Sequence, residues 1–236
     1  MRFKLCALTL VAISMTACAS STPGAKPHDM SAAQHEGMAG NEDKNAQLHA
    51  AQFDPNAAVE RCGRGATGRY GDGGCWTTNA TSEHLDAAKK HRKMAADHRA
   101  ASRTLRDAEA RACVGLSDDD RDMSPFMHQA DIASVEPLNV TVDGKPQLTR
   151  MEGAVVAFRA VPGMTAPWLQ RVVDCHLARN AALGHDVPEM PDCPLVPKNV
   201  TAKATATDAG FAVAIRSDDS QTAQEILKRA RALGGR

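Results

Sequence analysis

The sequence has few aromatic residues, no long apolar segment and no excess of charge of either sign. Phenylalanine, tryptophan and tyrosine together make up 3% of the 236 residues, so we expect one modest domain beside tails and helix, not one core along the whole chain. Basic and acidic residues are equal in number, at 28 each, which argues against nucleic acid as a partner.

Catalytic signatures are lacking as well. There is no GxSxG and no P-loop, and His35-Glu36 is not followed by the second histidine of a zincin helix. The letters from Gly63 to Gly68 match GxGxxG, but no strand is predicted before them and no helix after them, so we expect no dinucleotide site. The acidic cluster Asp118–Asp122 lacks the alternation of a calcium loop. These absences favour a protein that is not an enzyme.

The first 17 residues have the organisation of an export signal. Arg2 and Lys4 precede an uncharged segment from Leu5 to Thr16, which is shorter than the roughly 20 residues that a transmembrane helix requires. We therefore expect residues 1–17 to be a cleaved signal peptide. Its removal leaves 26 basic against 28 acidic residues, a net charge near −2.

The signal ends in Met15-Thr16-Ala17-Cys18, which resembles the lipobox of bacterial lipoproteins. The resemblance implies that Cys18 becomes the acylated first residue of the mature chain and anchors it to a membrane. Ala19 and Ser20 follow with no aspartate, as in lipoproteins sent to the outer membrane, which implies an anchor there with the chain facing the periplasm. The alternative is an ordinary secretory signal cut near Ala17 or Ala19, which also exports the chain.

Two segments without regular periodicity are expected before the first helix. Residues 18–60 contain His and Met but no sustained apolar stripe, so we predict a disordered tether that cannot bury enough surface to offset its ordering entropy. Residues 61–80 hold six glycines between Cys62 and Cys75, and this composition predicts a Gly-rich loop.

Residues 81–134 predict a long helix and then a short one. The long helix begins at Thr81 or Ser82 and continues to Cys113, and Ser124-Pro125 is typical of the start of a second helix. Small and imidazole side chains form one stripe of the long helix, which another helix or an envelope protein partner could approach closely. The stripe comprises His84, Ala87, Ala88, His91, Met94, Ala95, His98, Ala101, Leu105, Ala108 and Ala112.

Residues 135–236 predict an α+β domain. A hairpin of two β-rich runs precedes a helix that Thr165 caps and Gly184 ends. A second hairpin, turning at Asp208-Ala-Gly210, precedes a helix capped at Ser217-Asp-Asp219. Strands followed by a helix, twice over, favour a two-layer α+β sandwich of antiparallel hairpins and two helices. The predicted fold class is therefore α+β, with a disordered N-terminal tether and one long helix.

Five cysteines remain after Cys18, and an exported chain meets an oxidising compartment in which disulfides persist. We predict that Cys175 pairs with Cys193 and that Cys62 pairs with Cys75. Cys113 would then stay free, although it could instead pair with Cys62 or Cys75. The competing interpretation makes Cys175, His176 and Cys193 metal ligands, but adjacent residues on a helix point about 100° apart and do not easily share one ion.

Methionine and histidine lie together at several places and resemble the Met and His motifs of periplasmic copper-handling proteins. Thioether sulfur prefers Cu(I), and imidazole accepts Cu(I) or Cu(II). His84, His91 and His98 lie seven residues apart, about 10 Å along a helix, so these three cannot share one ion. The alternatives are a merely solvated tether and imidazoles that simply pack on a helix face. The candidate ligands are His28, Met30, His35, Met38, His91, Met94, His98, Met127 and His128.

Two functional hypotheses follow. The first is a lipoprotein that is anchored to a membrane and binds a soft metal ion such as copper. The second is a structural or protein-interaction lipoprotein of the envelope, docking through the Ala/His face of the long helix.

Overall fold

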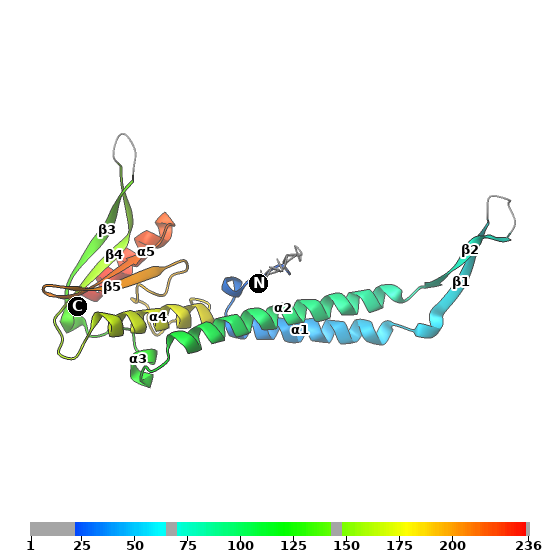
Figure 1. Ribbon diagram of the computed structural model, residues 1–236, viewed down its shortest axis with the longest axis horizontal. Helices are drawn as coiled ribbons and strands as arrows, with labels where there is room; N and C mark the ends of the chain where they lie inside the picture. Colours follow the sequence, from blue (N-terminus) through cyan, green and yellow to red (C-terminus); the bar gives the residue numbers. More distant parts are fainter. Residues whose placement is uncertain (1–21, 65–69, 143–147, 235–236) are drawn as a thin grey trace, which may run out of the picture.

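The computed structural model describes residues 22–64, 70–142 and 148–234, so the predicted signal peptide and Cys18 lie outside the described residues. Two long antiparallel helices form a hairpin that carries a β-ribbon at one end and an α+β domain at the other (Figure 1). The α+β class predicted from the sequence is confirmed. Among the described residues, no helix is long and apolar enough to cross a membrane.

Helix α1 (Ala32–Gln52) lies within the segment predicted to be a disordered tether, and that prediction is wrong for these residues. Ser31 caps the helix: its side chain accepts a hydrogen bond from Gln34 N, and the Gln34 side chain accepts one from Ser31 N. Two glycines and few apolar residues make α1 a poor helix by itself, so it depends on packing against its partner helix. A short 3₁₀ turn (Pro27–Asp29) precedes it.

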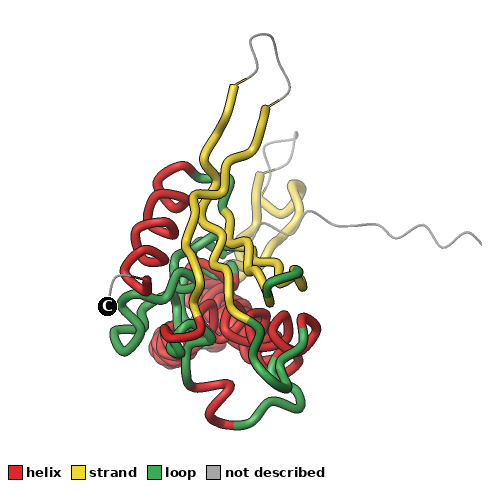
Figure 2. The backbone as a smooth tube through the Cα atoms, turned by 90° about the vertical axis from the view of Figure 1, so that its left-hand side faces the viewer, coloured by secondary structure: helices red, strands yellow, loops and turns green. Residues whose placement is uncertain are grey.

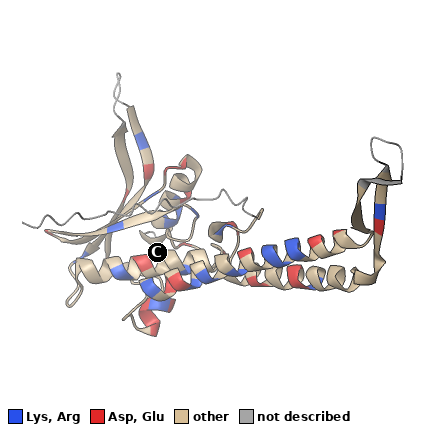
Figure 3. Cartoon of the chain, turned by 45° about the vertical axis from the view of Figure 1, so that its right-hand side comes forward, with Lys and Arg blue, Asp and Glu red and all other residues tan. Residues whose placement is uncertain are grey.

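Helix α2 (Ser82–Ala112) is confirmed as predicted and is about 46 Å long at 1.5 Å per residue. Its Ala/His face is covered by α1 of the same chain, so the surface that we expected to meet an envelope partner is already occupied. Basic and acidic residues are interspersed along both helices (Figure 3). Lys93 Nζ lies 2.6 Å from Asp97, and this hydrogen bond lowers the pKa of Asp97.

The described residues of the glycine-rich segment, on either side of 65–69, form a β-ribbon and not the predicted loop. A 3₁₀ turn (Pro55–Ala57) leads into β1 (Ala58–Arg64), which pairs antiparallel with β2 (Tyr70–Asn79). Cys62 lies opposite Cys75 in this register and the two form a disulfide, which confirms that predicted pair.

After α2 the chain turns through helix α3 (Asp118–Asp122) and a 3₁₀ turn (Gln129–Asp131). The short helix predicted after Ser124 is not present: Ser124 Oγ instead accepts a hydrogen bond from Phe126 N in a turn. A helix forms earlier in the chain instead, as α3. The Ser117 side chain accepts a hydrogen bond from Asp120 N, and three acidic residues in the first turn complement the positive N-terminal end of the helix.

The C-terminal domain is the predicted two-layer sandwich. Its antiparallel sheet has the order β3-β4-β6-β5, from strands β3 (Ile132–Val142), β4 (Leu148–Arg159), β5 (Thr201–Thr207) and β6 (Gly210–Arg216). Helices α4 (Ala166–Ala182) and α5 (Ser220–Gly234) share one core with the sheet. The parts of β3 and β4 that adjoin residues 143–147 project beyond the rest of the domain (Figure 2).

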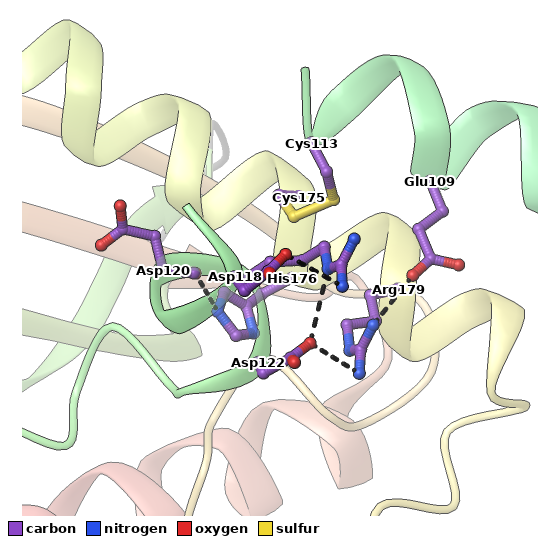
Figure 4. Close-up of a disulfide and its surroundings, with 9 residues drawn as sticks. Glu109, Cys113, Asp118, Asp120, Asp122, Cys175, His176 and Arg179 are labelled. Carbon is purple, nitrogen blue, oxygen red and sulfur yellow. Dashed lines mark hydrogen bonds and ion pairs between the residues drawn. A yellow bond between two sulfur atoms is a disulfide. The ribbon is translucent and has the colours of Figure 1, made fainter. Parts of the chain in front are cut away.

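A disulfide and a small polar cluster join the hairpin to the domain (Figure 4). Cys113 at the end of α2 is bonded to Cys175 of α4, so the predicted Cys175–Cys193 pair is wrong. Cys193 is free and buried, and burial raises the pKa of its thiol. Arg179 pairs with Glu109 at 3.1 Å and with Asp122 at 3.0 Å. The start of α1 touches the same region, because a Cβ at Gly184 would come within 2.9 Å of Ser31.

Candidate metal centre in the helical hairpin

The interface of α1 and α2 is built from alanine and histidine where most helix pairs use large apolar residues. Inward-facing residues recur every four and then three positions, the pattern of an antiparallel coiled coil. Fully or nearly fully buried alanines let the two backbones approach closely. Histidine or glutamate occupies the alternate layers. The alanine layers are formed by Ala39, Ala46, Ala88 and Ala95, and the polar layers pair His35 with His98, Glu42 with His91, and His49 with His84.

The His35–His98 layer is the most deeply buried of the three. His35 is 0% exposed and His98 is 2% exposed, and their Nδ1 atoms lie 3.1 Å apart. His35 Nε2 lies 3.3 Å from the carbonyl oxygen of Pro27, which can only accept, so this nitrogen carries the proton. In neutral His35, Nδ1 is then an acceptor that faces His98.

This arrangement of His35 is the one that metal-binding imidazoles use. A ligating histidine usually donates its second ring N–H to a backbone carbonyl, which fixes the tautomer and the ring orientation. A tetrahedral ion with bonds of 2.0–2.1 Å holds two ligand nitrogens about 3.3 Å apart. The His35–His98 spacing of 3.1 Å is close to that value.

Two methionines lie one turn away on the same helix faces. Met38 follows His35 by three residues and Met94 precedes His98 by four, spacings that place side chains on one face of a helix. Both are half-buried. In the antiparallel register they lie at the level of the Ala39 and Ala95 layer, next to the His35–His98 pair. The register therefore places two predicted ligands of each helix within about one helical turn of the His35–His98 pair.

The other two polar layers lie nearer the ribbon and are half-buried. His91 Nδ1 lies 2.5 Å from a carboxylate oxygen of Glu42. His49 Nδ1 lies 3.3 Å from His84 Nδ1, and the rings of His49 and His91 stack with centroids 5.4 Å apart. Sequence reasoning did not select Glu42, His49 and His84 as ligands. The seven-residue spacing of His35, Glu42 and His49 matches that of three histidines in α2. This spacing is the sequence signal that could have identified Glu42 and His49.

The remaining predicted ligands are elsewhere. His28 is exposed in the turn before α1, and Met30 is half-buried between that turn and α1. Met127 and His128 are exposed at the base of the domain, far along the chain from the hairpin layers. These residues do not join the His35–His98 layer.

Among the histidines, cysteines, aspartates and glutamates of the described residues, only Glu60, Cys62 and Cys75 form a group of three candidate ligand atoms within 4.8 Å of one another. The two sulfurs of that group are bonded to each other, so they do not offer a thiolate pair. Two of the polar layers therefore offer a pair of nitrogens each, and the layer of Glu42 and His91 offers one nitrogen and one carboxylate oxygen.

No protein-family model matches the chain, and no curated protein and no solved structure is similar to it at a significant level.

Proposed function

We propose that the chain is an exported lipoprotein, anchored through Cys18, that binds copper between α1 and α2 of its hairpin. The lipobox resemblance supports the anchor, and two disulfides suit a chain that folds in an oxidising compartment. The outer membrane, with the chain facing the periplasm, is the location that the residues after Cys18 favour.

The observation that carries the metal proposal is the buried pair of Nδ1 atoms in His35 and His98, with Met38 and Met94 about one turn away along the two helices. Two imidazoles and two thioethers form a ligand set that favours Cu(I) over zinc and over oxygen-seeking ions. Bound between the two imidazoles, copper would link the helices. Storage, buffering or tolerance of copper are the roles that such a site supports.

Titration of the purified mature chain with Cu(I) against a competing chelator tests this site. The double variant Met38→Leu/Met94→Leu conserves volume and leaves both histidines in place. We expect it to weaken binding about 10- to 100-fold, the range that loss of even an outer-shell partner causes in metal sites. The matched control is Met123→Leu/Met127→Leu, which removes two exposed thioethers elsewhere and should leave the hairpin affinity unchanged.

Two results would contradict the proposal. One is identical affinity and stoichiometry in the Met38/Met94 variant and the wild type. The other is wild-type affinity no better than that of a peptide with the scrambled sequence of residues 26–52. X-ray absorption of the loaded protein gives an independent readout, because the site requires both nitrogen and sulfur in the first coordination shell.

The exposed ribbon supports a second candidate function, an envelope interaction protein. Val59 and Trp76 are 56% and 52% exposed, and the β1/β2 register places them on the same face, opposite the disulfide face. A photo-crosslinking residue in place of Trp76 should then capture a specific envelope protein in intact cells. The same residue in place of Ala100, on the outer side of α2, should not.

A further inference from the structure

A cavity lies at the base of the α+β domain, away from the hairpin layers. It has a volume of about 510 Å³, within the range of 300–1,000 Å³ typical of small-molecule sites. The segment 119–131, the end of β4 and the first half of α4 form its walls.

The walls of this cavity are mainly apolar and adaptable. Phe158, Leu169 and Val172 are buried at its inner side. Trp168 and Met164 are half-buried, and Met123 and Met127 are 40% and 45% exposed. Unbranched, polarizable methionine side chains can repack around apolar bodies of different shape. The indole of Trp168 also offers a face that attracts cations.

All the fully charged side chains that line the cavity are acidic. They are Asp119, Asp120 and Asp131, and no lysine or arginine is found among its described lining residues. Asp120 accepts a hydrogen bond from Ser117 Oγ at 2.7 Å, whereas the side chains of Asp119 and Asp131 form no ion pair with the part of the chain that the structure describes. His128, the one basic side chain present, is exposed.

We propose that this cavity binds a lipophilic organic cation, an amine or quaternary centre carried on an apolar body. The apolar walls and Trp168 receive the body of the ligand, and the carboxylates of Asp119 and Asp131 neutralise its charge. A volume of this size is far larger than a metal ion needs, which favours an organic ligand over a second copper site. The proposal does not depend on metal binding in the hairpin.

The test compares two probes of nearly the same shape and opposite charge, tetraphenylphosphonium and tetraphenylborate. The chain has two tryptophans, so a Trp76→Phe background leaves Trp168 as the only tryptophan reporter. We expect tetraphenylphosphonium to change Trp168 fluorescence saturably, and tetraphenylborate to have no saturable effect at the same concentrations. In the same background, Asp119→Asn/Asp131→Asn should weaken the cation about tenfold, as expected for two partly exposed charges.

A matched control removes two exposed carboxylates at the ribbon end of α2, through Glu83→Gln/Asp86→Asn, and should bind the cation as the parent does. Three results would overturn the proposal: equal binding of both probes, no saturable binding of the cation, or equal affinities in the two double variants. A response of Trp168 to Ag(I) without any response to tetraphenylphosphonium would also overturn it and would identify a soft-metal site instead. Because none of these readouts uses the hairpin histidines, failure here leaves the copper proposal intact.

Discussion

Removal of the Cys113–Cys175 disulfide should destabilise the protein more than any other single covalent change in the described chain. The bond closes a loop with a sequence separation of 62, and the chain-entropy relation gives about 4 kcal/mol for a loop of that length. The Cys62–Cys75 bond has a separation of 13 and is worth about 3 kcal/mol by the same relation. At 2–4 °C per kcal/mol for a chain of this size, the larger loss corresponds to a fall in Tm of about 8–16 °C.

The polar contacts at this joint cannot replace the covalent bond. Arg179 and Glu109 have side chains about one-quarter exposed, and Asp122 is about half exposed. Ion pairs open to solvent contribute at most about 1 kcal/mol each. In the variant Cys113→Ser/Cys175→Ser, the helical hairpin should therefore separate from the α+β domain before that domain unfolds.

Urea unfolding followed by circular dichroism measures this effect, with Cys62→Ser/Cys75→Ser as the comparison. Peptide mapping without reductant should recover Cys113 linked to Cys175, and the variant Cys193→Ser should keep both disulfides. A loss below about 1 kcal/mol in the Cys113/Cys175 variant would refute the reasoning from loop entropy. A peptide that links Cys175 to Cys193 would refute the pairing itself.

Three further predictions concern the buried groups. Burial lowers the pKa of His176 below the unfolded value near 6.5, so the unfolded chain takes up the proton first as pH falls. The free energy of unfolding should therefore decrease below about pH 6.5. Urea titrations at several pH values should show a smaller decrease in the variant His176→Gln. Ala39→Leu should cost about 1–3 kcal/mol by forcing α1 and α2 apart, whereas Ala100→Leu on the exposed side of α2 should change the free energy of unfolding by less than about 0.5 kcal/mol. The Cys193 thiol, buried and with a raised pKa, should react with iodoacetamide only in denaturant, and rapid labelling of the native protein would contradict its placement in the core.

The sequence could predict the elements whose signals are local. Helix α2 has a continuous run of helix-tolerant residues, and helices α4 and α5 are capped where predicted, by Thr165 and within Ser217–Asp219. The two hairpins of the C-terminal domain follow from β-rich runs separated by turn residues. In each of these elements, the residues that form the structure lie within a few positions of one another.

Helix α1 could not be predicted in the same way, because its stabilising contacts are with α2. Gly37 and Gly40 lower its intrinsic helix propensity, and its buried side is made of alanine and histidine where an apolar stripe would be expected. The β-ribbon was not predicted, because a segment rich in glycine is typical of a loop. The pair Cys62–Cys75 was predicted, but the pair alone does not indicate that it joins two strands. Cys113 and Cys175 meet only because α4 packs against the end of α2, and no local pattern encodes that contact.

The candidate site was predicted in its parts but not as a whole. Sequence reasoning selected His35 with Met38 and Met94 with His98, but placed the first pair in a disordered tether. Only the antiparallel register of the hairpin brings the two pairs to one level. Met127 and His128, selected for the same chemistry, lie instead beside an acidic, apolar cavity whose size argues for a different ligand.

The contact between Thr22 and Asp97 determines how the molecule would sit at a bilayer. Thr22 Oγ1 donates to Asp97, which lies near the midpoint of α2. Cys18 precedes Thr22 by four residues, which span at most about 14 Å when fully extended. If acyl chains are attached at Cys18, the tether is thus too short to let the hairpin stand upright on one end. The rod would lie lengthwise near the lipid headgroups, with the ribbon and the α+β domain at its opposite ends.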